Sequence, residues 1–357
     1  MAQDINSLLN AIIEKNASDI HLHVDKPPTM RLNDRLIDLD EKPLTPDDTL
    51  TYMKAITPPE GQQEVEKVGG TDFGYAFEDK ARFRVSVYRQ KGNINIAMRL
   101  IPYKFLSFEE LGLSQSIKKL CHRPRGLVLV TGPTGSGKTT TLATMIDYIN
   151  SSRDCHIITI EDPIEYYHTH KKSIVTQREL GADVPSFPEA LRRGLRQDPD
   201  VFLVGEMRDL DTISAAITAA ETGHLIFGTL HTTGAARTVD RIVDVFPIDQ
   251  QEQIRIMLSV SIIAVVSEQL LVRADGKGRI AAFEIMVATP AIQNLIREKK
   301  TYRILSELQT GAKYGMKTMD ESLIELYSSG LITYENLLGN AYDPEQIRIQ
   351  VEGVKKR

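Results

Sequence analysis

The stretch GLVLVTGPTGSGKTTTLATMIDYIN (residues 126–150) decides the fold of the second part of this 357-residue chain. An apolar run leads into GPTGSGKT (132–139), which matches the pattern G-x-x-x-x-G-K-[ST] of a phosphate-binding loop. The next residues place apolar side chains on one helical stripe, formed by Leu142, Met145, Ile146 and Ile149. A strand, a glycine-rich loop and a helix in this order are the context that the motif requires. The sequence therefore predicts a phosphate loop and not a chance glycine-rich turn.

Each part of this loop has an expected task on a nucleotide. The glycines let backbone N–H groups surround phosphate oxygens, and the N-terminal end of the following helix adds a partial positive charge. Lys138 is expected to reach the β- and γ-phosphates, and the hydroxyl of Thr139 to bind Mg²⁺. The residues predicted to bind ATP are Gly132, Pro133, Thr134, Gly135, Ser136, Gly137, Lys138, Thr139 and Thr140.

The rest of the chain divides into parts with different patterns. Residues 1–101 predict an α+β domain with helices beside a largely antiparallel sheet, because a helical pattern is followed by strand-like runs such as NINIAMRLI (93–101). A proline-containing linker is expected at 102–115. Residues 116–287 alternate short apolar runs with helical patterns, which is typical of a buried parallel sheet with crossover helices. Residues 288–357 are predicted to be mostly helical.

The composition is that of a soluble globular protein, with 41% hydrophobic and 25% charged residues. The longest apolar run, MLSVSIIAVVSEQLLV (257–272), is interrupted by Glu268 and predicts a buried helix or strand pair, not a membrane span. Cys121 and Cys155 are the only cysteines, so neither a zinc cluster nor a disulfide framework is expected. The start of the chain lacks a signal-peptide pattern, and we expect a cytoplasmic setting.

The net charge of −5 bears on the partners of the protein. Proteins that bind nucleic acids usually carry a large positive field. We therefore expect no nucleic-acid partner.

Acidic residues follow an apolar run in TIEDPIEY (159–166). The carboxyl ends of parallel strands face the ligand crevice of an open sheet, so Glu161, Asp162 and Glu165 are expected near the phosphate loop. Pro163 places these acids on a turn. They are candidates for activating water or for holding Mg²⁺, and the alternative is that they cap the next helix and face solvent.

The run VFLVGEMRD (201–209) lacks an expected residue. Where an apolar strand should deliver an aspartate to Mg²⁺, the chain has Gly205 followed by Glu206. Because glutamate is longer than aspartate, Glu206 can reach Mg²⁺ directly or through a water molecule, or it can be the base for the attacking water. The glycine lets another backbone segment approach closely.

Two histidines occur in TGHLIFGTLHT (222–232). His231 follows the apolar strand, so its imidazole is expected in the crevice, where it can hydrogen-bond the γ-phosphate. His224 precedes the strand and is expected at the far end, with a structural role.

Four motifs together resemble those of the hexameric secretion ATPase superfamily, and within it the type IV pilus twitching-motor family PilT. They are GPTGSGKT, TIEDPIEY, the Walker B-like DPDVFLVGEMRD and TGHLIFGTLHTT. The resemblance covers nearly the whole chain, and the motifs are specific because they are separate in sequence but would meet at one site. It implies a PAS-like N-terminal domain, a RecA-like P-loop ATPase domain with a helical C-terminal region, and a homohexamer that binds ATP and Mg²⁺ between its domains.

The resemblance also implies roles for individual residues. Lys138 and Thr139 would bind phosphate and metal, and His231 would contact the γ-phosphate. Either Glu165 or Glu206 would activate water, and the other would help to hold Mg²⁺.

Arginines on the polar face of two neighbouring strands become candidate arginine fingers in such a family. They are Arg82, Arg84 and Arg99. A guanidinium can stabilise the charge that develops on a transferred phosphate, although a row of arginines is also common on a solvated surface. The sequence leaves open whether they act on their own subunit's ATP or on a neighbour's.

Two features favour retraction over extension within the superfamily. Extension and secretion ATPases usually carry a tetracysteine zinc motif after the histidine motif, whereas both cysteines of this chain precede it. AIQNLIRE (291–298) is close to the AIRNLIRE of retraction motors, with Gln293 in place of the arginine. The resemblance therefore implies a motor for pilus retraction in twitching motility, with a pilus extension or type II secretion ATPase as the alternative.

For such a motor, the implied partner is the inner-membrane platform protein of the pilus machine. Attachment to the inner face of the cytoplasmic membrane would be peripheral. Two other classes of protein remain as alternatives. The first is a nucleic-acid translocase, which the net charge disfavours. The second is a nucleotide-sensing regulator, which the set of acids, His231 and arginines disfavours.

Overall fold

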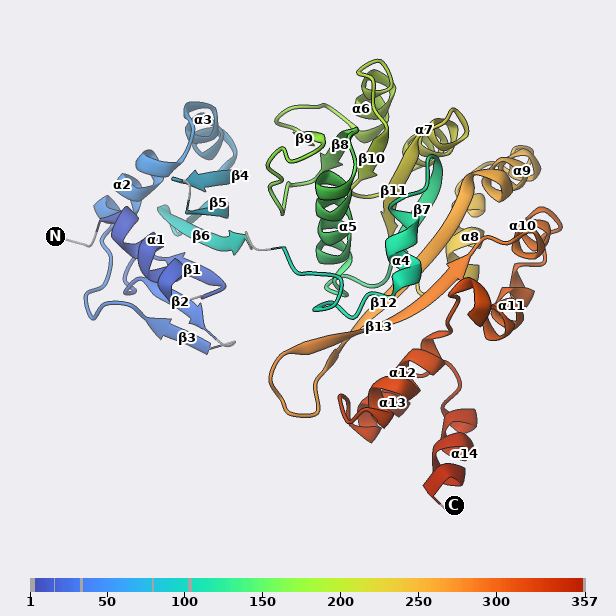
Figure 1. Cartoon of the computed structure of the whole chain (residues 1–357). Coiled ribbons are helices and arrows are strands. Elements are labelled where there is room, and N and C mark those ends of the chain that lie inside the picture. Colours follow the sequence, from blue (N-terminus) through green and yellow to red (C-terminus); the bar gives the residue numbers. More distant parts are fainter. Residues whose placement is uncertain (1–3, 16, 33–34, 79, 102–104, 356–357) are drawn as a thin grey trace. The chain divides into compact units, whose positions relative to one another are not determined.

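The computed structural model describes residues 4–15, 17–32, 35–78, 80–101 and 105–355. The chain forms two compact units, 1–104 and 105–357, and each is described by itself (Figure 1). Three residues of the expected linker, 102–104, lie outside the described residues. The other expected domain boundaries stay predictions.

The first unit is an antiparallel sheet with helices, which confirms the predicted α+β class. Its strand order is β3-β2-β1-β6-β5-β4. The strands are β1 (Asp19–Leu22), β2 (Thr29–Leu32), β3 (Arg35–Asp38), β4 (Gly70–Phe77), β5 (Ala81–Gln90) and β6 (Asn93–Ile101). The helices are α1 (Ile5–Glu14), α2 (Pro46–Ile56) and α3 (Pro59–Val68).

Local sequence accounts for these elements. The side chain of Thr45 accepts a hydrogen bond from the backbone N–H of Asp48, and the Asp48 carboxylate accepts one from the Thr45 backbone, so a capping box begins α2. Alternation along β5 buries Phe83 and Val85 in the core of the unit and leaves Arg84 exposed.

The second unit contains a larger sheet with the strand order β13-β12-β7-β11-β10-β8-β9. Its neighbouring strands run parallel except for β12 and β13, which form an antiparallel pair at one edge. The strands are β7 (Gly126–Thr131), β8 (His156–Glu161), β9 (Ile174–Glu179), β10 (Val201–Val204), β11 (Leu225–Leu230), β12 (Ile262–Val272) and β13 (Arg279–Val287). The predicted buried parallel sheet is confirmed.

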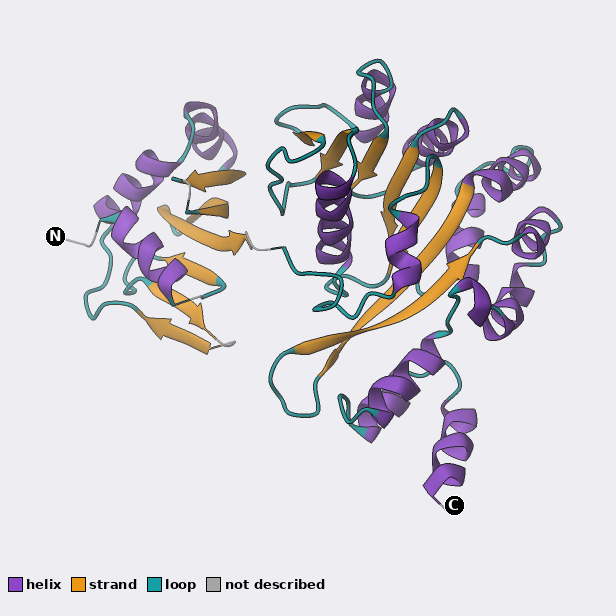
Figure 2. Cartoon of the chain, viewed as in Figure 1, coloured by secondary structure: helices purple, strands orange, loops and turns teal. Residues whose placement is uncertain are grey.

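Helices cover both faces of this sheet (Figure 2). One face packs against α4 (Gln115–Leu120) and α5 (Lys138–Ser152). The other packs against α6 (Phe187–Gly194), α7 (Leu210–Glu221), α8 (Ala235–Asp244), α9 (Gln251–Ser261), α10 (Pro290–Arg297) and α11 (Ile304–Thr310). The remaining helical segments are η1 (Thr301–Arg303), η2 (Ala312–Tyr314), α12 (Met319–Ser328), α13 (Tyr334–Asn340) and α14 (Pro344–Lys355).

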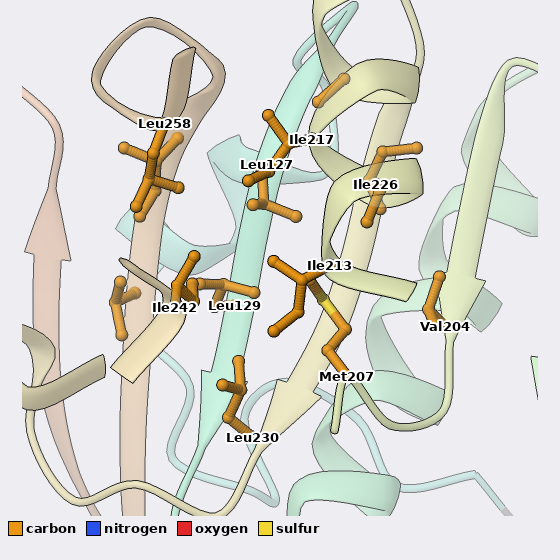
Figure 3. Close-up of a cluster of buried hydrophobic side chains, with 14 of the residues drawn as sticks. Leu127, Leu129, Val204, Met207, Ile213, Ile217, Ile226, Leu230, Ile242 and Leu258 are labelled. Carbon is orange, nitrogen blue, oxygen red and sulfur yellow. The ribbon is translucent and has the colours of Figure 1, made fainter. Parts of the chain in front are cut away.

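Burial on both faces explains the uninterrupted apolar runs of the sequence. Leu127 and Leu129 of β7 lie in the core under α7, α8 and α9, whereas Val128 and Val130 lie in the core under α4 and α5. Figure 3 shows the first of these cores, with Leu127 and Leu129 facing the side chains of α7 and α8. A strand that is buried on both faces carries apolar residues at every position.

The run 257–272 is divided between two kinds of element. Helix α9 ends at Ser261 and β12 begins at Ile262, so the structure has a helix joined to a strand and not the single helix or strand pair that the sequence predicts. The strand part pairs with β7, with Ser267 opposite Thr131. Among the described helices, none combines the length and apolar character that a membrane crossing needs.

Candidate active site at the phosphate loop

The phosphate loop connects the carboxyl end of β7 with the first residue of α5. Gly132 and Gly137 have φ angles of 148° and 105°, in the range that favours glycine. A Cβ atom on Gly132 would lie 2.4 Å from the backbone oxygen of Glu268. Helix α5 has 15 residues, so the loop lies at the positive end of a long helix, as a phosphate site requires.

Lys138 folds back over this loop. Its Nζ donates to the backbone oxygens of Gly132, at 2.8 Å, and Pro133, at 3.0 Å. Burial lowers the pKa of Lys138, and the negative charges of Glu268, Glu206 and Glu165 act in the opposite direction. The half-buried ammonium group of Lys138 therefore lies against the loop, where it can bind a phosphate of a nucleotide.

Next to the loop, a cavity of about 80 Å³ collects the predicted acidic residues. Thr139 at the start of α5 lines it, and so do carboxylates at or after the ends of β8 and β10. These are Glu161, Asp162, Glu165 and Glu206. The structure thus brings the predicted metal-binding and water-activating residues of three separate motifs to one place.

Gly205 directly follows β10 and is packed against the backbone of β8. Its N–H donates to the backbone oxygen of Ile160 at 2.8 Å, and the Thr229 hydroxyl donates to its carbonyl oxygen at 2.5 Å. A Cβ atom at this position would lie 3.1 Å from the Ile160 oxygen. Met207, two residues after Gly205, is buried in the core beside Val204 and Ile213 (Figure 3). These contacts fix the backbone on both sides of Glu206, and they explain why a glycine precedes it.

Glu206 is engaged by two side chains. His231 Nε2 lies 2.9 Å from Glu206 Oε1, and Arg208 Nε donates to the same oxygen. His231 Nδ1 is 3.5 Å from the hydroxyl of Thr134 in the phosphate loop. His231 therefore lies between Glu206 and the loop, where a γ-phosphate would be within its reach. Arg208 is not among the residues predicted from the sequence, because a single arginine after a strand does not differ from an ordinary surface arginine.

Glu161 differs from the other acids because it is buried. Its Oε1 accepts hydrogen bonds from the Thr159 hydroxyl, at 2.6 Å, and from Gln177 Nε2, at 3.2 Å. Burial raises the pKa of Glu161 to about 7. Asp162 and Glu165 are exposed on the wall of the cavity. Asp162, Glu165 and Glu206 are therefore more open than Glu161 to a nucleotide that enters from solvent.

Two further contacts around the loop involve residues that the sequence did not single out as site residues. The Thr140 hydroxyl is 3.1 Å from the hydroxyl of Tyr166. The Thr141 hydroxyl donates to Glu268 Oε2 at 2.7 Å. The only sequence signal for Glu268 was a single acid within an apolar run.

The donor set fits a magnesium ion that is shared with substrate. Among the described residues, no three His, Cys, Asp or Glu side chains are grouped so as to hold a metal by themselves. Mg²⁺ commonly keeps water ligands and is bound by one or two protein groups together with substrate phosphates. The hydroxyl of Thr139 and the carboxylate of Glu206, on the same cavity, match this mode.

The three candidate arginines lie in the first unit. Arg84 on β5 and Arg99 on β6 are directly opposite each other, and both are exposed. Arg99 Nε donates to Asp19 Oδ1 at 2.9 Å. Arg82 lies opposite Ile101 on the same strand pair.

Fold and phosphate-loop geometry together define a RecA-like P-loop ATPase. The family model described as type II/IV secretion system protein matches residues 1–277, and the chain belongs to this family. Within it, the chain is 48% identical over 342 residues to the type IV pilus retraction ATPase PilT of Pseudomonas aeruginosa. That match covers 96% of this chain and 99% of the relative.

Two other relatives agree with this placement. The chain is 54% identical over 286 residues to a twitching motility protein of Neisseria gonorrhoeae, a match that covers 80% of this chain and 75% of the relative. The crystal structure of the pilus retraction motor PilT with bound ADP has a TM-score of 0.91 and 47% identity. It covers 96% of this chain and 98% of that one. The resemblance to the PilT family is confirmed.

Proposed function

We propose that this protein is an ATP-hydrolysing motor that powers the retraction of type IV pili in twitching motility. The observation that carries the proposal is the near-full-length similarity to PilT, with the family's motifs gathered around one phosphate loop. ATP-driven movement of the two units would perform the mechanical work.

Each site residue has a proposed task in hydrolysis. The amides of the loop from Gly132 to Thr140 and the ammonium group of Lys138 bind the phosphates. Mg²⁺, when bound, neutralises the charge that develops on the phosphates. The hydroxyl of Thr139 holds this ion. Glu206 assists directly or through a water molecule, with Glu161 and Asp162 as weaker candidates.

The remaining residues act on water and on the transferred phosphate. Glu165 is the proposed base for the attacking water, because Glu206 is already hydrogen-bonded to His231 and Arg208. His231 contacts the γ-phosphate. Three arginines of the first unit supply positive charge to the transition state, namely Arg82, Arg84 and Arg99.

The proposal extends to assembly and location. The protein works as a homohexamer in the cytoplasm and attaches peripherally to the inner face of the cytoplasmic membrane. Its partner there is the inner-membrane platform protein of the pilus machine. The similarity to a pilus retraction motor supports these assignments.

Deletion of the gene in its host tests the direction of the motor. Loss of a retraction motor leaves pili that are assembled but not withdrawn, so we expect many surface pili and no twitching. A bald strain would instead indicate pilus extension, and a normally piliated strain with a secretion defect would indicate a secretion ATPase. Stimulation of ATP hydrolysis by DNA or RNA would favour a translocase.

A further inference from the structure

Glu268 is a buried carboxylate beneath the phosphate loop. Because β12 pairs with β7 so that Ser267 lies opposite Thr131, the next residue, Glu268, lies beside the first residue of the loop. Its backbone oxygen closes the space beside Gly132, and the residue is only 1% exposed. A charged carboxylate is costly to bury unless it is paired and fully hydrogen-bonded.

The two oxygens of this carboxylate have different surroundings. Oε2 accepts a hydrogen bond from the Thr141 hydroxyl, whereas Oε1 finds no hydrogen-bond partner among the described residues. A Cβ atom on Gly137 would lie 3.3 Å from Oε1, so this oxygen is directed at the backbone of the loop. The hydroxyl of Ser136 in the loop is likewise buried without a described partner. Both side chains line a cavity of about 630 Å³ that borders the loop.

Lys138 on α5 is the charged group that acts most directly on Glu268. The strand neighbours are uncharged: Phe283 on β13 lies opposite Glu268, and Thr131 on β7 lies opposite the preceding residue, Ser267. The other charged side chains that line the cavity are Glu109, Glu110, Arg273, Arg279, Lys317 and Glu325. Burial raises the pKa of Glu268 to about 8, and the hydrogen bond from Thr141 and the charge of Lys138 act in the opposite direction.

A bound nucleotide changes this balance of charge. Its negatively charged phosphates bind at the loop amides and attract the ammonium group of Lys138. Without a nucleotide, the positive charge of this group offsets the negative charge of Glu268. We propose that Glu268 is a positioning residue of the phosphate loop that becomes more fully protonated when a nucleotide binds, and that this protonation sets how tightly the nucleotide is held. The proton comes from solvent and forms an O–H bond on the carboxylate, and no other bond changes.

The direction of the pH effect follows from linkage. In the nucleotide-bound state, Glu268 has the higher affinity for a proton. The affinity for nucleotide is therefore fully present at low pH. It falls as the pH rises through the pKa of Glu268 in the free protein toward its pKa in the complex. Nucleotide release is then easier at high pH. The inference rests on the phosphate-loop site proposed above but not on retraction.

Calorimetric titration of the full-length protein with ADP tests the inference without hydrolysis. The heat of binding is measured at about pH 8 in buffers of different ionisation enthalpy, which counts the protons taken up. We expect the wild type to take up more protons than Glu268→Gln, which keeps the acceptor for Thr141 but cannot ionise. From about pH 7 to about pH 9, the affinity of the wild type should fall about tenfold relative to that of Glu268→Gln.

Two further variants control for structural effects. Glu284→Gln changes another buried glutamate, which accepts from the backbone N–H of Ala235 away from the loop, and should behave as the wild type. Thr141→Val removes the hydrogen bond to the ionised Glu268, so the free protein is already more protonated and proton uptake should decrease. Equal proton uptake and equal pH dependence in the wild type and Glu268→Gln would overturn the inference. A wild type that does not bind ADP at all would overturn the phosphate-loop site, and this inference with it.

Discussion

Glu165 and Glu206 line the same cavity but have different surroundings. Glu206 is hydrogen-bonded to His231 and to Arg208, whereas Glu165 is exposed on the cavity wall. Two carboxylates at one site can take different tasks when their environments differ. We therefore assign the attacking water to Glu165 and assistance at Mg²⁺ to Glu206.

Amide substitutions separate these two tasks. Glu165→Gln should lower kcat about 100-fold and leave the Mg²⁺ requirement unchanged, because it removes only the base. Glu206→Gln should raise the Mg²⁺ concentration for half-maximal rate about tenfold, because it removes a charged group near the ion. Steady-state phosphate release over a Mg²⁺ titration measures both effects.

Glu189→Gln, at a partly exposed acid on α6 outside the cavity, is the matched control and should have the rate of the wild type. The assignment is wrong if Glu165→Gln hydrolyses ATP as fast as the wild type. It is reversed if the Mg²⁺ requirement changes in Glu165→Gln and not in Glu206→Gln.

At the scale of elements, the ends of β8 and β10 determine where the acids lie. Gly205 lets these two strands approach until its N–H bonds to Ile160. An aspartate at this position would not restore a metal ligand, because its Cβ atom would meet the Ile160 oxygen at 3.1 Å.

Gly205→Asp should therefore lower both stability and activity. Forcing extra atoms into a packed position costs about 1–3 kcal/mol, and the displaced strand carries Glu206 with it. Urea denaturation measures the first effect and phosphate release the second. A variant with wild-type stability and a higher hydrolysis rate would contradict the account of this glycine.

Glu161 at the end of β8 predicts a pH-dependent stability. Burial raises the folded-state pKa of Glu161 to about 7, above its value in the unfolded chain. The contribution of Glu161 to the free energy of unfolding is therefore fully present below the unfolded pKa and is lost as the pH rises through the folded pKa. Glu161→Gln avoids the cost of burying a charge. It should exceed the wild type in unfolding free energy by about 2–3 kcal/mol near pH 8 and lose this advantage near pH 5. Thermal melts at the two pH values test this, and an advantage of equal size at both would contradict it.

The sequence predicted these elements unevenly. The apolar runs of β7, β8, β10 and β11 are short and bounded by glycine, proline or acids, so local pattern sufficed. The run 257–272 has no glycine or proline to mark a boundary, and the change from α9 to β12 depends on pairing with β7, which no local pattern contains. Strand β9 was not predicted, because its residues are mostly partly buried and polar.

At the scale of the whole molecule, the site combines what is contiguous in sequence with what only the fold brings together. The phosphate loop could be predicted completely, since one short motif contains it. The contacts of Glu206 with His231 and of Glu268 with Thr141 join segments that are far apart in the sequence, so they depend on strand order and register. The acids and His231 were expected near the loop only because they follow parallel strands.

The arginines of the first unit give a prediction about the molecule as a motor. If they stabilise the transferred phosphate, alanine at one or more of Arg82, Arg84 and Arg99 should lower kcat about 100-fold or more. The affinity for ADP should stay within about threefold, because ADP lacks the transferred group. Phosphate release and ADP titration measure the two quantities.

Arg89→Ala, at an exposed arginine farther along β5, is the control. The proposal fails if none of the three variants is slowed.

The central claim is that ATP hydrolysis at this site powers pilus retraction. The most direct test replaces Glu165, the proposed base, by glutamine in the chromosome of the host and records surface pili together with twitching on a surface. We expect a strain with normal levels of the protein, abundant pili and no twitching. A strain that twitches as the wild type does, or one that has lost its pili, would contradict it.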